Sequence, residues 1–117
     1  MSDYPTDLTA EGLQPFAQRA LIFLHQQAAK HAKAHADANY MASWVKSEKA
    51  RIKGLFGDMS NAAAEDKAFM HPDYLRALEA AREADTVWYE VQFKREAAQT
   101  VLDCWRTACS NARANAG

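Results

Sequence analysis

Glycine and proline are scarce in this sequence of 117 residues, which contains four glycines and three prolines. Such a chain has little material for turns, and its many alanines are strong helix formers, so the composition predicts an all-α fold. The length suits one domain and is too short for two independent hydrophobic cores. We therefore expect a single helical domain over residues 1–117.

Long apolar runs are also missing. No stretch approaches the roughly 20 apolar residues of a membrane span. The acidic, polar start MSDYPTDLTAEG is unlike a signal peptide or a basic transit peptide. The two cysteines, Cys104 and Cys109, would point to different sides of a helix, which argues against a disulfide between them. These absences predict a cytoplasmic protein with reduced thiols and no membrane segment.

A strong charge of either sign is absent as well, since the net charge is −1. The average hides an uneven distribution. Residues 16–56 carry seven Lys or Arg against two acids, whereas residues 1–15 carry three acids and no base. Any affinity for an anionic partner is therefore expected from residues 16–56 and not from the whole chain.

Apolar residues recur every three or four positions in the first half of the chain and predict a helix over residues 13–56. We expect residues 1–12 to form a lead-in capped by Thr9 or Asp7, and Pro15 to lie in the first helical turn. These apolar residues form a stripe along the helix, which consists of Leu13, Ala17, Ala20, Leu24, Ala34, Ala38, Met41, Val45, Ile52 and Leu55. Gln27, His31 and Glu48 interrupt the stripe.

Glycines at positions 54 and 57 end this helix, and residues 57–71 form a linker with one short helical turn around residues 62–68. Pro72 suits the first position of a second helix over residues 72–113. Its stripe consists of Tyr74, Ala77, Ala81, Ala84, Trp88, Val91, Ala98, Leu102, Trp105, Cys109 and Ala112. The spacing averages about 3.5 residues, so the two helices are predicted to pair as an antiparallel, coiled-coil-like hairpin.

Both predicted helices carry further apolar residues off the stripe. These are Ile22, Tyr40 and Trp44 on the first helix, and Leu75, Tyr89 and Phe93 on the second. A two-helix hairpin covers apolar surface poorly, so we expect a homo-oligomer whose subunit contacts include Ile22, Leu75, Tyr89 and Phe93. The alternative is that these side chains pack against the linker and the N-terminal segment.

Catalytic motifs are not found, because the sequence has no glycine-rich phosphate loop, nucleophile elbow or paired-cysteine motif. His31 and His35 have the spacing of two metal ligands on one helix face, but no carboxylate or cysteine completes the set there. A metal-dependent enzyme is therefore the weakest interpretation. We expect no enzymatic activity, no metal and no cofactor.

The segment WVKSEKARIK, residues 44–53, is the most basic part of the chain. On a helical wheel, a strip of alternating cations and aromatic rings lies away from the stripe, formed by Lys33, Tyr40, Trp44 and Arg51. A second row, Lys46, Lys49 and Lys53, flanks the stripe. Cations for phosphates and exposed rings for bases are typical of single-stranded nucleic acid binding. The alternative is a solvated helix face, with Tyr40 and Trp44 in a subunit contact.

The sequence KSEKARIKGLFGDM, followed by an acidic, alanine-containing linker and a long second helix, resembles the UvsY family of phage recombination mediators. Lys49, Ala50, Arg51 and Ile52 match the basic Lys-Ala-Arg-Leu segment of that family. The resemblance implies a helical, self-assembling protein in a bacterial host cell. It also implies binding of single-stranded DNA, and loading of a phage or host RecA-like recombinase onto DNA covered by single-strand-binding protein.

On this hypothesis Lys49 and Arg51 contact phosphates, Lys46, Lys53 and Lys33 assist, and Trp44 or Tyr40 stacks on bases. The alternative function is an oligomeric coiled-coil adaptor or inhibitor whose partner is another protein. Trp44, Tyr89 and Phe93 would then be the aromatic anchors of that interface.

Overall fold

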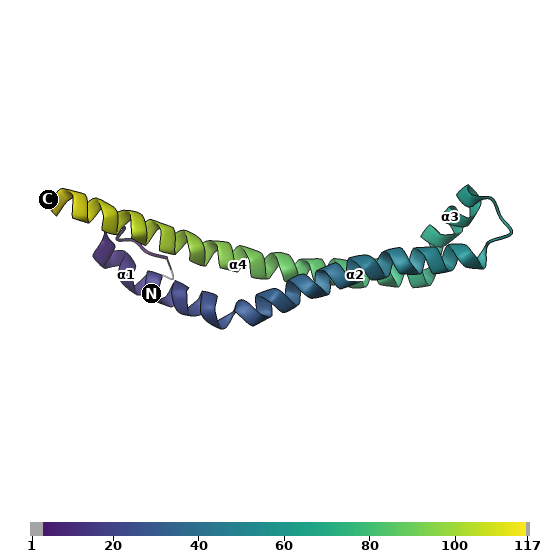
Figure 1. Cartoon of the computed structure of the whole chain (residues 1–117), viewed down its shortest axis with the longest axis horizontal. Helices are drawn as coiled ribbons and strands as arrows, with labels where there is room; N and C mark the ends of the chain where they lie inside the picture. Colours follow the sequence, from purple (N-terminus) through teal and green to yellow (C-terminus); the bar gives the residue numbers. More distant parts are fainter. Residues whose placement is uncertain (1–3, 117) are drawn as a thin grey trace. The chain divides into compact units, whose positions relative to one another are not determined.

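The computed structural model describes residues 4–116. Within that range the chain forms four helices and no strand. The helices are labelled in Figure 1. The helices are α1 (Ala10–Gln26), α2 (Ala28–Leu55), α3 (Asn61–Met70) and α4 (Pro72–Ala116). The predicted all-α fold is confirmed. Residues 1–3 of the predicted lead-in, and Gly117 at the end of the predicted domain, lie outside the described residues.

The chain divides into two compact units. Unit 1 contains the residues up to Lys30 and those from Val91 onward, that is, α1 and the C-terminal part of α4. Unit 2 spans His31–Glu90 and contains most of α2, all of α3 and the N-terminal part of α4.

In unit 1, α1 packs on α4 through small side chains. The buried residues Ala17, Ala20 and Leu102 form its core, and the half-buried Leu24, Ala98, Val101 and Trp105 pack against them. Leu13, near the start of α1, lines a hollow with Ala108 of α4, whereas Ala20, further along α1, packs with the earlier residue Leu102 of α4. The two helices therefore run in opposite directions. Small residues let the backbones approach closely, as the many alanines of the stripe predict.

The start of α1 is held by two side chains. Thr9 Oγ1 accepts a hydrogen bond from the Gly12 N–H at 3.1 Å, which satisfies one of the free donors of the first turn. Asp7 Oδ1 accepts from the Thr9 N–H at 3.0 Å and from the Thr9 hydroxyl at 2.8 Å. These bonds, the backbone one foremost, lower the pKa of the Asp7 carboxyl.

In unit 2, the core is formed by Ile52, Ala68 and Tyr74, one from each of its three helices, with Val45 and Phe56 packed against it. Ile52 of α2 thus meets the beginning of α4. Towards the start of α2, the His35 ring lies 4.4 Å from the Trp88 ring, between centroids. Residues further along α4 thus contact residues nearer the start of α2, so within unit 2 these helices are antiparallel, as the predicted hairpin requires.

The first predicted helix, residues 13–56, is wrong in one respect, because the structure divides it into α1 and α2. Gln27 separates α1 from α2 with a ψ of 0°, although its N–H still bonds to the Phe23 carbonyl at 2.9 Å. Neither glycine nor proline marks this point. The break falls between Leu24 and Ala34, where Gln27 and His31 interrupt the apolar stripe, so few apolar contacts are available to hold a regular turn there.

Helix boundaries also differ from the prediction. α1 begins at Ala10, three residues before the predicted start, because Thr9 serves as its N-cap, so Pro15 lies in the second turn. α4 continues to Ala116, beyond the predicted end at residue 113.

The predicted linker contains a full helix of ten residues, α3, where one turn was expected. Ser60 Oγ caps α3 by accepting from the Ala63 N–H at 3.2 Å, and Ala64 and Ala68 are buried. Leu55, which the stripe placed in the core, is exposed at the end of α2.

Candidate nucleic-acid interface

The cations of the predicted DNA-binding segment lie on α2, but they differ in exposure and partners. Lys46 is exposed and Lys53 is half-buried. Lys33 is exposed and pairs with Asp37, one turn further along the helix, at 2.7 Å. Lys49 and Arg51, to which the sequence assigns the phosphate contacts, instead hold carboxylates from other helices.

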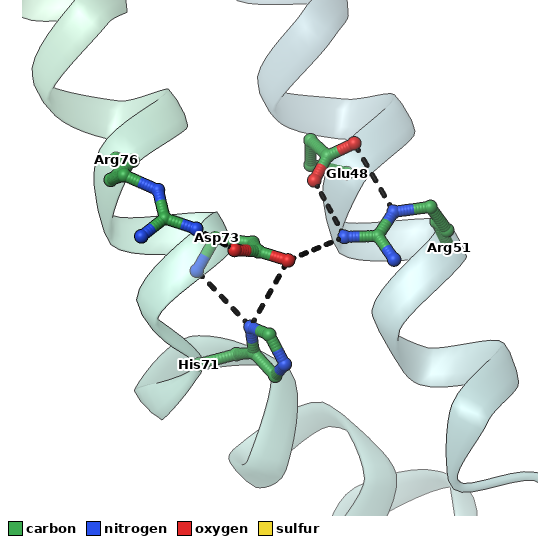
Figure 2. Close-up of polar contacts among 5 residues, drawn as sticks. All are labelled: Glu48, Arg51, His71, Asp73 and Arg76. Atoms are coloured by element: carbon green, nitrogen blue, oxygen red, sulfur yellow. Dashed lines mark hydrogen bonds and ion pairs between the residues drawn. The ribbon is translucent and has the colours of Figure 1, made fainter.

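Arg51 is held on two sides. Its Nε and Nη2 donate to the two Glu48 oxygens at 3.2 and 2.9 Å, and Nη2 also donates to Asp73 Oδ2 of α4 at 3.0 Å, as Figure 2 shows. The hydrogen bond from Arg51 is the main cause that lowers the pKa of Glu48 and the pKa of Asp73. The same bonds, the one to Glu48 foremost, raise the pKa of Arg51.

Asp73 stands at the centre of the polar cluster formed by Glu48, Arg51, His71, Asp73 and Arg76 (Figure 2). Besides Arg51, its carboxylate accepts from Arg76 on α4. The backbone N–H of Asp73 donates to His71 Nδ1 at 3.1 Å. Asp73 lies in the first turn of α4, and the N-terminus of a helix favours negative charge.

Lys49 pairs with α3. Its Nζ lies 2.6 Å from Glu65 Oε1 and 4.5 Å from the centre of the Phe69 ring. The Lys49 hydrogen bond is the main cause that lowers the pKa of Glu65. A carboxylate and an aromatic face thus surround this ammonium group, two kinds of partner that each favour its charge.

Tyr40 and Trp44 remain exposed, with 62% and 44% of their surfaces accessible. They lie four residues apart on α2 and line one hollow of about 350 Å³. We call it the Tyr40 hollow. Met41, Ala77 and Ala80 also line it, together with Glu48, Asp73 and Arg76 of the polar cluster. The hollow therefore combines aromatic rings and apolar surface with charges of both signs.

The residues predicted to form subunit contacts are all exposed within their own units. Ile22 and Phe93 belong to unit 1, and Leu75 and Tyr89 belong to unit 2. Between 51% and 65% of the surface of each is accessible. Their exposure in the single chain meets a necessary condition for the predicted oligomer, which itself stays a prediction.

His31 and His35 both contact the same aromatic partner. The ring centroid of Trp88 is 4.9 Å from that of His31 and 4.4 Å from that of His35, and the His35 ring is stacked on it. Across residues 4–116, no three His, Cys, Asp or Glu side chains gather as a set that could hold a metal ion. The spacing that suggested two ligands therefore serves a packing contact in unit 2.

Glu65, Phe69, His71, Asp73 and Arg76 were not predicted as members of the site. Their signal in the sequence is weak, since Glu65 and Asp73 are 16 and 22 residues from their basic partners. Only the packing of α3 and α4 on α2 brings them together.

None of the helices in the described part of the chain is long and apolar enough to cross a membrane. No model of a known protein family matches this chain, and neither a curated protein nor a solved structure is significantly similar to it.

Proposed function

We propose that this chain is a non-catalytic, single-stranded DNA-binding accessory protein of phage or prophage origin, which helps to load a RecA-like recombinase. The observation that carries the proposal is the exposure of Tyr40 and Trp44 on one side of α2. Rings on a helix surface offer stacking faces to bases of any sequence. The resemblance of Lys49–Ile52 to the mediator motif supports the recombination role.

Lysines beside the two rings supply cations for the phosphates of a bound DNA strand. Lys33 lies seven residues before Tyr40, two helical turns away on the same side of α2, and Lys46 is exposed two residues after Trp44. Their long, flexible side chains suit phosphates whose positions vary along a single strand. Self-association would present several such faces to one strand, which would let a chain of net charge −1 hold DNA.

The test replaces Lys49 and Arg51 together by alanine. Fluorescence anisotropy of a labelled oligo-dT, over a salt series, should show weaker binding by Lys49→Ala/Arg51→Ala. The logarithm of the wild-type affinity should fall with the logarithm of salt concentration, with a slope of about −0.7 per phosphate neutralised. The control is Lys94→Ala, which removes one exposed lysine of α4 in unit 1 and should change binding much less than the double variant. Equal binding by the double variant and the wild type would contradict a role of these cations.

Trp44→Ala separates stacking from packing. It should weaken oligo-dT binding by about 1–3 kcal/mol if the ring stacks on a base. Light scattering on the same samples should show an unchanged mass. A lower mass with unchanged binding would place Trp44 in a subunit contact and remove the observation on which the proposal rests.

A second candidate function is a helical adaptor or inhibitor that binds another protein. The exposed aromatic residues Tyr89 and Phe93 favour it, because aromatic side chains are enriched in protein interfaces. Sedimentation equilibrium tests this alternative in part. A mass well above 13.1 kDa would show that copies of the chain associate, and a monomer without DNA affinity would favour a different protein as the partner.

A further inference from the structure

The two cations that the mediator motif offers to phosphates are occupied by carboxylates from other helices. Lys49 holds Glu65 of α3 at 2.6 Å, and Arg51 holds Asp73 of α4 at 3.0 Å. A carboxylate and a phosphodiester use the same kind of acceptor oxygen towards ammonium and guanidinium groups. Each of these carboxylates therefore competes with a DNA phosphate for its cation.

The three helices of unit 2 are joined by an apolar core as well as by these ion pairs. Ile52 of α2, Ala68 of α3 and Tyr74 of α4 already join the three helices in a buried cluster. The side chains of both ion pairs are between 31% and 47% accessible, so water and ions reach them. Pairs exposed to this degree contribute little to stability and can exchange partners without unfolding.

We propose that Glu65 and Asp73 form an autoinhibitory contact, in which each occupies the cation that would otherwise bind a phosphate of single-stranded DNA. The proposal rests on the DNA-binding function proposed above. In the free chain Lys49 and Arg51 are neutralised, and an approaching strand gains them only after it displaces Glu65 from Lys49 and both Asp73 and Glu48 from Arg51. The contact lowers the affinity of the chain for any polyanion. Ligands that also contact Tyr40 and Trp44 then bind most tightly.

The central experiment compares two neighbouring acids of α3. Glu65→Gln removes the charge that pairs with Lys49 while keeping a side chain of nearly the same shape. Asp66→Asn removes the charge of the next residue, which is exposed and forms no ion pair with any residue in the range 4–116. Both variants change the net charge of the chain equally, so a general electrostatic effect would be similar in the two.

We expect Glu65→Gln to bind labelled oligo-dT about two- to fivefold more tightly than the wild type, since an exposed ion pair of ordinary strength no longer competes. Asp66→Asn should give a smaller gain. In a Lys49→Ala background the gain from Glu65→Gln should disappear, because the cation that it frees is absent. Equal gains from both acids, or a gain that persists without Lys49, would overturn the autoinhibitory contact.

Asp73→Asn provides the second, independent variant, acting on Arg51. It should also bind more tightly, by less than Glu65→Gln, because Glu48 still pairs with Arg51. Far-UV circular dichroism should show unchanged helicity for every variant. If the wild type binds oligo-dT and neither Glu65→Gln nor Asp73→Asn changes its affinity, only the autoinhibitory contact is wrong. If the wild type and all variants fail to bind at low salt, the DNA-binding function itself is wrong. Binding that appears only in the variants would support both.

Discussion

Unit 1 and unit 2 are both built on small buried residues, but they differ in what joins their helices. In unit 1 the core between α1 and α4 is apolar, with Leu102 set against two alanines. In unit 2 an apolar core around Ile52 is accompanied by ion pairs from α2 to α3 and from α2 to α4. Loss of apolar volume should therefore weaken either unit, whereas acid and salt should act more strongly on unit 2.

The largest expected effects come from truncating the two cores. Leu102→Ala in unit 1 and Ile52→Ala in unit 2 should each lower the free energy of unfolding by about 2–5 kcal/mol, because each leaves a cavity among buried neighbours. Urea denaturation followed by circular dichroism measures the change. Val87→Ala, which shortens an exposed side chain of α4, is the control and should change stability by less than about 0.5 kcal/mol.

Amide hydrogen exchange on the same variants would show whether each substitution destabilises mainly its own unit. We expect Leu102→Ala to raise exchange mainly in α1, and Ile52→Ala to raise it mainly in α3, since these helices pack on the truncated residues. If either substitution raised exchange equally throughout both units, the chain would unfold as one body, and the distinction between the units would have no energetic meaning.

A smaller effect is expected from the helix caps, one in each unit. Thr9→Ala in unit 1 and Ser60→Ala in unit 2 each leave a first-turn N–H without its side-chain acceptor. Each should cost about 1 kcal/mol of stability in urea denaturation. Thr9→Ser and Ser60→Thr keep the hydroxyl and should stay near the wild type. A loss in these conservative variants as large as in the alanine variants would rule out capping as the cause.

The smallest effect is expected from pH. The pKa values of Glu48, Glu65 and Asp73 in unit 2 are lowered by their basic partners from ordinary values of 4.5, 4.5 and 3.8. A carboxyl with a lowered folded-state pKa stabilises fully above its unfolded-state pKa, and this contribution is lost as the pH falls towards the folded-state value. Stability conferred by these groups is thus present at neutral pH and declines below about pH 4.5.

Asp7 gives unit 1 one carboxyl with a lowered pKa, against the three of unit 2 among residues 4–116. Protection factors from amide exchange, which are corrected for the intrinsic effect of pH, should therefore fall earlier in α3 than in α1. Glu65→Gln should reduce this difference. A uniform loss of protection on acidification would show that the ion pairs of unit 2 contribute no measurable stability.

Much of the core could be predicted from the sequence, because periodicity reports directly which side of a helix is covered. Leu13, Ile52, Tyr74 and Leu102 were all placed on the stripes and are buried. The break at Gln27 could not be predicted, because no residue type that usually ends a helix occurs there. α3 was underestimated because its alanines form helix readily but give a weak pattern of apolar spacing.

The candidate site was only partly predictable for a different reason. Exposure of Tyr40 and Trp44 follows from their place off the stripe, which a helical wheel reveals. The partners of Lys49 and Arg51 depend on tertiary packing, since Glu65 and Asp73 reach them from other helices. The sequence indicated the cations but not the acids that pair with them. This pairing neutralises Lys49 and Arg51, and so alters the binding expected of them.

Alanines make up seven of the eleven buried apolar residues in the range 4–116. A methyl group at each of these positions sets how closely two helices approach, so side-chain volume matters there more than polarity. Over evolutionary time, glycine or serine could replace Ala34 or Ala38 at modest cost, whereas leucine would wedge the helices apart. Divergent descendants of this chain should therefore retain small residues at these buried positions even after their surface charges and aromatic rings have changed.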